Sequence, residues 1–156
     1  QANLTRGALY HHFGDKKGLL AAVIAQIDAE MDARLHAISD TASDPWDGFR
    51  HRCRAYLEMA REPEIQRIVL RDGRAVLGAP TPQAQLHCVA SLRSMLEQLM
   101  AQGVVAQANP QALASLICGG LAETAFWIAE EDGQSQRLEQ ALHAMELMLT
   151  GLRSAS

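Results

Sequence analysis

Proline directly follows a helix-capping side chain at three places in this sequence, and this pattern constrains the fold more than any other feature. Side chains of Asp, Thr and Asn accept hydrogen bonds from backbone N–H groups that have no partner at a helix start. Proline is tolerated at the first helical position because the N–H that it lacks would be unpaired there anyway. The sequence therefore predicts helix starts at three pairs, Asp44-Pro45, Thr81-Pro82 and Asn109-Pro110.

The remaining pattern is also helical. The period-two alternation that predicts strands is nearly absent, and we expect Glu62-Pro63 to end one helix and begin the next. The sequence therefore predicts an all-α fold with helices at about 5–13, 15–39, 45–61, 63–71, 82–102, 110–130 and 134–153.

The second predicted helix is the longest and has one apolar stripe. Its apolar residues recur at steps of three and four, with charged residues opposite. At 1.5 Å per residue, such a helix is about 35 Å long, enough to join one end of the molecule to its body. An ordinary surface helix is the alternative. The stripe consists of Leu20, Ile24, Ile27, Met31, Leu35 and Ile38.

Composition indicates a globular protein, with 48% apolar and 21% charged residues. No apolar run approaches the roughly 20 residues of a membrane span, and no signal-peptide pattern opens the chain. The net charge of −4 divides unevenly, with +2 in residues 1–20 and −6 in the remainder. A basic tip on an acidic body is typical of a small DNA-binding module attached to another domain.

The three cysteines are Cys53, Cys88 and Cys118. An odd count without close spacing argues against a disulfide framework and fits a reducing cytoplasm. Each lies in an apolar helical context, which predicts a small buried hydrophobic residue. A redox sensor is the alternative.

The opening segment carries the most specific motif. Residues 4–13 predict a short helix with Thr, Arg, Tyr and two His on its outer side; Gly14 ends it, and Asp15 is positioned to cap the next helix. Such a helix suits the major groove of DNA. The segment resembles the end of the helix-turn-helix in TetR-family transcriptional regulators, which it matches at Thr5, Gly7, Leu9, Tyr10, His12, Phe13 and Lys16.

Two later segments also resemble one group of TetR ligand-binding domains: residues 67–78 and the apolar helix 113–129 with its embedded Glu123. The resemblance implies the end of a truncated DNA-binding domain at 1–18 and a helical ligand-binding and dimerisation domain at 19–156. In that family two further helices precede the recognition helix, so we expect the chain to be a fragment of a longer protein. The long second helix then corresponds to the helix that moves as a lever when ligand binds.

By resemblance, the recognition helix contacts bases through Thr5, Arg6 and His11 and phosphates through Tyr10, His12 and Lys16. Arg6 suits a guanine edge, and Gly7 lets the helix approach the groove closely. The alternative is a short polar surface helix.

A ligand pocket in such a bundle would be lined by bulky inward-facing side chains with a few polar groups. Plain core packing is the alternative for each. Glu123, in an apolar helix, needs a partner such as Arg54, Arg71 or a ligand, unless it is protonated or exposed. The candidates are Trp46, Phe49, Cys53, Tyr56, Cys88, Leu92, Met95, Glu123, Phe126 and Trp127.

The last two predicted helices have apolar residues on more than one face, which predicts a two-fold subunit interface. In TetR-like proteins the corresponding helices pair as a four-helix bundle. The residues predicted at this interface are Leu116, Gly120, Leu138, Leu142, Met145 and Leu149.

We therefore expect a cytoplasmic, homodimeric repressor of a pseudo-palindromic operator in double-stranded DNA, released by a small-molecule effector, with no cofactor and no membrane partner. A helical ligand-binding or dimerisation protein without DNA binding is the alternative. An enzyme is disfavoured because the sequence has no HExxH motif, no Cys/His metal-ligand spacing and no Gly-rich phosphate loop.

Overall fold

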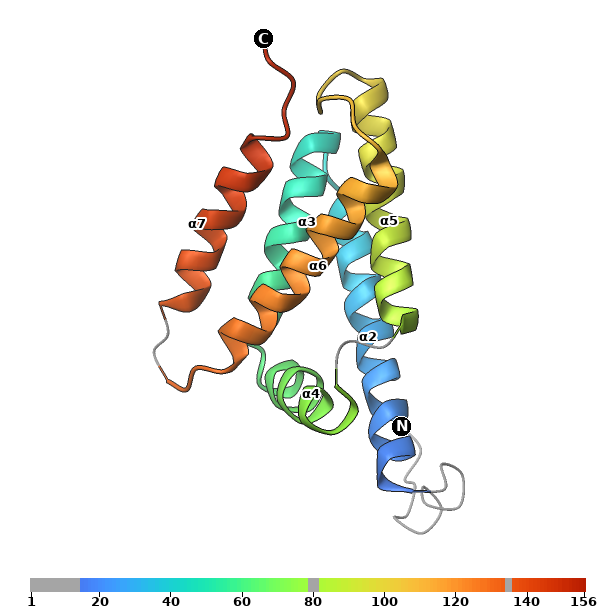
Figure 1. Cartoon of the computed structure of the whole chain (residues 1–156), viewed down its shortest axis with the longest axis vertical. Helices are drawn as coiled ribbons and strands as arrows, with labels where there is room; N and C mark the ends of the chain where they lie inside the picture. The colour runs from blue at the N-terminus through green and yellow to red at the C-terminus, as the bar shows by residue number, and fades with distance from the viewer. Residues whose placement is uncertain (1–14, 79–81, 134–135) are drawn as a thin grey trace.

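The computed structural model of the chain describes residues 15–78, 82–133 and 136–156. Within these ranges the regular structure is helical, apart from one isolated antiparallel bridge between Val105 and Arg153 (Figure 1). The all-α prediction is confirmed. The expected helix at 5–13 lies outside the described residues.

The helices begin and end within a few residues of the predicted bounds. The five longest correspond one to one with predicted helices, and the predicted helix at 63–71 continues further than expected. In chain order the elements are α2 (Lys16–Asp40), α3 (Pro45–Met59), the π-helix η1 (Ile65–Asp72), α4 (Gly73–Leu77), α5 (Pro82–Ala101), α6 (Pro110–Ala129) and α7 (Arg137–Thr150).

Side-chain caps fix three of these helix starts, as the sequence predicts. Each capping oxygen accepts from a backbone N–H of the first helical turn that lacks an intrahelical partner. Thr81, the fourth predicted cap, lies outside the described residues. The caps are Asp15, Asp44 and Asn109, which accept from Gly18, Trp46 and Ala112 at 2.6, 3.3 and 2.9 Å.

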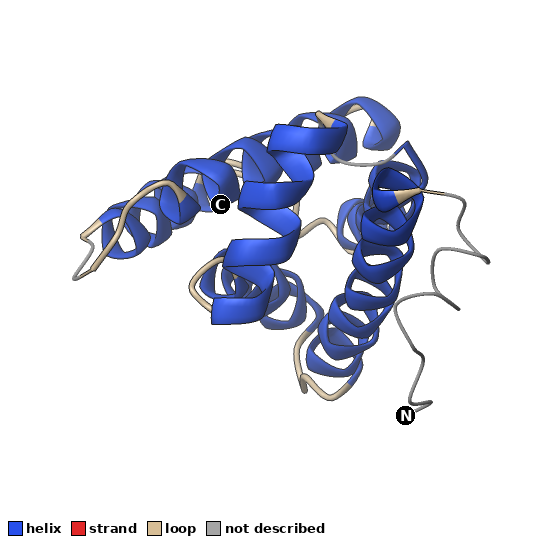
Figure 2. Ribbon diagram, turned by 90° about the horizontal axis from the view of Figure 1, so that it is seen from below, coloured by secondary structure: helices blue, strands red, loops and turns tan. Residues whose placement is uncertain are grey.

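The core forms where α3, α5, α6 and α7 meet. Each contributes a fully buried apolar side chain: Phe49, Leu96, Ile128 and Leu149. Helix α6 crosses α3 diagonally, and α7 packs against α3 at the edge of the molecule (Figure 1). Seen from below, the described residues again form helices joined by loops (Figure 2).

The apolar stripe of α2 faces the other helices, as predicted. Ile24, Ile27, Met31 and Leu35 are buried. The helix runs without interruption across the expected domain boundary at residues 18 and 19, so its N-terminal end projects beyond the bundle at the bottom of Figure 1. One rigid element therefore connects the body to the start of the chain.

The segment after Pro63 differs from the prediction. It continues to Leu77, and residues 65–72 are wound as a π-helix rather than an α-helix. Here the backbone N–H of Gly73 bonds to the carbonyl of Ile68, five residues earlier. A Cβ at Gly73 would lie 2.8 Å from Cδ1 of Ile24, so the glycine permits α4 to approach α2 closely. Hydrophobic periodicity cannot predict this winding, which is rare and often marks functional sites.

Helix α6 corrects one expectation. By length and composition alone it is apolar enough to cross a membrane, with a mean hydropathy of 1.6. Its window is 44% buried inside the fold, and the core helix of a soluble protein passes the same test. Ile117, Leu121 and Ile128 supply part of this buried face. The apolar character of α6 thus serves packing within the chain, with one exposed face remaining.

A second correction concerns the cysteines. Cys88 on α5 and Cys118 on α6 form a disulfide, with their Cα atoms 6.3 Å apart. The interpretation of these two residues as separate buried hydrophobic side chains is therefore wrong. Sequence spacing could not reveal the pair, because 30 residues separate them and only the packing of α5 along α6 brings them together. Cys53 is free and buried, as predicted.

Reducing the Cys88–Cys118 bond should destabilise the fold, because the cross-link restricts the unfolded chain. We expect the free energy of unfolding to fall by about 2–4 kcal/mol on adding dithiothreitol, measured by urea denaturation. The Cys88→Ala, Cys118→Ala double variant is the control, and its stability should not respond to the reductant. Equal stability of the wild-type chain with and without reductant would contradict the cross-link.

Candidate ligand-binding site

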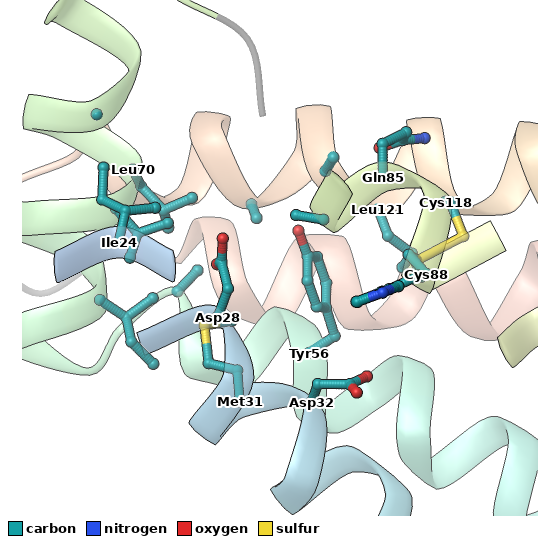
Figure 3. A pocket seen from close by; sticks show the side chains of 18 of the residues that line it. Ile24, Asp28, Met31, Asp32, Tyr56, Leu70, Gln85, Cys88, Cys118 and Leu121 are labelled. Carbon is teal, nitrogen blue, oxygen red and sulfur yellow. A yellow bond between two sulfur atoms is a disulfide. The ribbon is translucent and has the colours of Figure 1, made fainter. Parts of the chain in front are cut away.

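A cavity of about 360 Å³ lies between α2, α3, the η1–α4 segment, α5 and α6. This volume is within the range of small-molecule sites in proteins. Its walls are mainly apolar because each surrounding helix turns its buried stripe inward. Ile24 and Leu70 lie at one end in Figure 3, and Leu121 lies toward the other. The π-helix contributes Ile65, Val69 and Leu70 to this wall.

Two polar groups point into the apolar space from neighbouring helices. The carboxylate of Asp28 on α2 and the hydroxyl of Tyr56 on α3 are directed to the same part of the cavity (Figure 3). Burial raises the pKa of Asp28 from 3.8 to about 6. Burial, and then the nearby charge of Asp28, raise the pKa of Tyr56 to about 12. At neutral pH the site therefore presents an ionised carboxylate beside a neutral phenol.

Among the described residues, none donates a hydrogen bond to Asp28 or forms an ion pair with it. A partly buried carboxylate in apolar surroundings is unfavourable without such a partner. The raised pKa of Asp28 reflects this cost, since burial is its cause.

Asp32, one helical turn further along α2, has the opposite environment. Its Oδ1 lies 3.6 Å from Nη2 of Arg52 on α3 and 3.4 Å from Nδ1 of His36. Arg52 is only 5% exposed, and burial lowers its pKa. Its second nitrogen, Nη1, lies 3.5 Å from the hydroxyl of Ser39. The two carboxylates of the cavity wall thus differ, because only Asp32 has a cation beside it.

The disulfide forms part of the wall, where Cys88 and Cys118 face the cavity beyond Tyr56 (Figure 3). The third cysteine, Cys53, lines the cavity from α3, and burial raises the pKa of its thiol to about 12. It is therefore an un-ionised thiol at neutral pH and a poor nucleophile.

Half of the predicted pocket residues line the cavity and half lie elsewhere. Trp46 stacks on Phe49 within the core, with ring centroids 6.1 Å apart. Met95 is packed against the core, and Trp127 is partly exposed under the guanidinium of Arg137. The residues that do line the cavity are Cys53, Tyr56, Cys88, Leu92 and Phe126.

Glu123 is also outside the cavity wall. Its side chain is 72% exposed and pairs with Arg74, whose Nη2 lies 3.1 Å from Oε1. The expectation of an arginine partner is confirmed, but the partner is neither of the two that the sequence suggested. Arg54 pairs with Glu58, and Arg71 pairs with Asp132.

The acidic residues of α2 that line the cavity, Asp28 and Asp32, were not among the predicted pocket residues. Asp28 is four residues after Ile24, so the helical repeat places it beside the apolar stripe. Asp32 follows one turn later on the same side of the helix. A carboxylate at the margin of an apolar stripe was the available signal. It gained meaning only when α3 and α6 closed a cavity over that margin.

The predicted DNA-contacting residues fall almost entirely outside the described ranges: Thr5, Arg6, Gly7, Tyr10, His11 and His12. Lys16 is described; it is the first residue of α2 and is exposed.

The predicted interface residues divide into three groups. Leu116 is 73% exposed and Gly120 is exposed, so both are open to a partner subunit. Leu138 and Leu142 are partly buried. We correct the assignment of Met145 and Leu149, since both are buried inside the subunit and belong to its own core. The exposed large apolar residues of α7 are instead Leu147 and Met148.

Comparison with protein families gives two matches. Residues 46–152 match the model for the tetracyclin repressor-like C-terminal domain, and residues 1–23 match the model for bacterial regulatory proteins of the tetR family. The comparison with curated proteins finds no match.

Solved structures agree with these matches. A crystal structure of a TetR-family transcriptional regulator from Pectobacterium atrosepticum is 69% identical over 99% of this chain and 80% of that chain, with a TM-score of 0.93. A structure described as the molecular basis for control of antibiotic production by bacterial hormones is 21% identical, with a TM-score of 0.77 over 97% of this chain and 82% of that chain. The second likeness shows the fold alone. The family models and the 69% identity together show that the chain belongs to the TetR family of transcriptional regulators.

Proposed function

We propose that the protein is a homodimeric repressor that leaves a pseudo-palindromic operator when a small molecule fills the cavity. One observation carries this proposal: the cavity borders α2, and α2 continues directly from the part of the chain that matches the DNA-binding family model. Binding to chromosomal DNA would place the protein in the cytoplasm. The proposal assigns no catalytic role and no cofactor.

The coupling between the two sites follows from this arrangement. Ile24, Asp28, Met31 and Leu35 all lie on the cavity wall and all belong to α2. A ligand that fits best with α2 displaced will weaken DNA binding, and DNA will weaken ligand binding by the same factor. A coupling free energy of about 1–3 kcal/mol corresponds to a 5–150-fold change in affinity.

The proposed dimer uses the exposed faces of α6 and α7. Leu116 and Leu147 are among the most exposed large apolar residues of the described chain, at 73% and 65%. A Cβ built at Gly119 or Gly120 meets nothing within 4 Å, so this face of α6 is open. Because the glycines have no side chains, the backbone of a second helix can approach α6 closely here. Two-fold pairing of these faces would present two recognition helices to one side of the DNA.

Tyr10→Ala and Lys16→Ala in the full-length protein should each weaken binding to an operator selected from random duplexes. Lys16→Ala should also reduce the slope of log Kd against log salt concentration by about one, because a lost charged contact to phosphate releases one counterion fewer; Tyr10 is uncharged, so Tyr10→Ala should leave the slope nearly unchanged. Fluorescence anisotropy at several salt concentrations measures both effects.

Arg153→Ala is the matched control for Lys16→Ala. It also removes one positive charge, but near the C-terminus, at the opposite end of the molecule from the start of α2 (Figure 1). An unchanged salt slope in Lys16→Ala together with unchanged affinity in Tyr10→Ala would count against the DNA contacts. Failure to select any duplex would favour the alternative, a ligand-binding protein without DNA binding.

Leu116→Glu and Leu147→Glu should each convert the dimer to a monomer, measured by multi-angle light scattering. A charge buried at the interface without a partner is unfavourable, while both positions are exposed in the isolated subunit, so its fold should persist. Leu86→Glu is the control, since Leu86 is 64% exposed but lies on α5. Dimers that persist in both test variants would show that another face is used.

A further inference from the structure

We propose that the cavity binds an apolar organic monocation, such as a hydrophobic amine or ammonium compound, through the carboxylate of Asp28 and the ring of Tyr56. This inference rests on the proposed ligand-binding role of the cavity and adds the chemical class of the ligand.

Asp28 leaves one negative charge on the cavity wall without a partner among the described residues. Asp28 points into the cavity, and no described residue pairs with it, whereas Asp32 on the same wall is already paired with Arg52. A cationic group on a ligand would supply the partner that the fold does not. The pair would form in largely apolar surroundings, where charge–charge attraction is stronger than in water.

The polarity of the remaining cavity wall limits what the rest of the ligand can be. Most of the remaining wall is apolar, although Gln83, Gln85 and His87 of α5 add polar groups to it, so most of the rest of the ligand must be apolar to gain from burial. The ring of Tyr56 lies beside Asp28 in Figure 3 and can contact the cation through its face. The other aromatic ring of the wall, Phe126, already has the guanidinium of Arg74 4.2 Å from its centroid.

The side chains of the cavity suit an organic cation better than a metal ion. Metal sites use several ligand atoms from Asp, Glu, His or Cys. Among the described residues, no group of three such side chains is arranged to hold a metal. One free carboxylate and one phenol in an apolar cavity fit an organic cation better.

Titration of Asp28 gives a further expectation. With its pKa at about 6, the carboxylate takes up a proton as the pH falls through 6 and then no longer attracts a cation. Affinity for a permanent cation should therefore be high above pH 7 and fall about tenfold per pH unit well below pH 6. The other ionisable groups on the cavity wall are Asp32 on α2, Arg52, Cys53 and Tyr56 on α3, Arg74 on α4 and His87 on α5.

The test compares phenyltrimethylammonium with tert-butylbenzene, its neutral carbon isostere. We expect the ammonium to raise the melting temperature of the chain at pH 7.5 and to bind measurably by calorimetry. Asp28→Asn should weaken ammonium binding about tenfold or more, because the variant removes the negative charge that attracts the cation in largely apolar surroundings. The same variant should leave the affinity for tert-butylbenzene unchanged or increase it, because the variant removes a charge from the cavity wall.

Two control variants isolate the role of Asp28. Glu30→Gln removes the same charge from an exposed position on α2, outside the cavity wall, and should leave ammonium affinity unchanged. Histidine ordinarily titrates near pH 6.5. His87→Gln should therefore retain the pH dependence if Asp28 is its source, while Asp28→Asn should abolish it.

The outcomes distinguish this inference from the proposed function. Equal or tighter binding of tert-butylbenzene, no ammonium binding, or an Asp28→Asn effect below twofold would overturn the ligand class, and operator binding would still stand. Conversely, Asp28-dependent ammonium binding by a protein that selects no DNA would support the ligand class and overturn the repressor.

Discussion

The rest of the structure depends on the apolar face of α2, which both packs against the bundle and borders the cavity. The stripe on α2 must bury enough surface to hold the helix against the bundle, yet its Ile24 end and its Met31–Leu35 end also border an unfilled space. A fully packed stripe would make α2 an ordinary core helix. Because part of the stripe borders a cavity, the packing of α2 is sensitive to what the cavity contains.

The charges on α2 follow from the same division. Asp32 lies where α3 is close enough to supply Arg52, a buried cation that is itself costly without an anion. Asp28 lies one turn nearer the start of the helix, where it lines the cavity and none of the described residues pairs with it. Two identical side chains on one helix therefore have different electrostatic roles, one structural and one available to a ligand.

The fold could be read from the sequence because its signals are local. Asp44 and Asn109 cap helices through atoms two or three residues away, and the spacing of Ile24, Ile27 and Met31 depends only on the helical repeat. These features need no knowledge of distant contacts. The same applies to the DNA-binding motif, which the family comparison supports at residues 1–23.

The cavity could be read only in part, because its wall is assembled from segments far apart in the chain. Tyr56 and Phe126 were found because bulky side chains on bundle helices commonly face inward. Asp28 was missed, and the Cys88–Cys118 bond was predicted not to form, because each depends on how two helices pack. The π-helical segment η1 packs against α2 and α6, and hydrophobic periodicity did not predict its winding.

The length of α2 has a mechanical consequence. Asp28 is twelve positions after Lys16, so the helix extends about 18 Å from the cavity to its N-terminal end. If α2 pivots at the cavity, a swing of about 5° carries that end through an arc of roughly 1.5 Å. In a two-fold pair the arcs add, so the spacing of the two ends changes by up to about 3 Å, against a DNA helical repeat of about 34 Å. A small angular adjustment around a bound molecule is thus converted into a mismatch with the fixed geometry of the double helix.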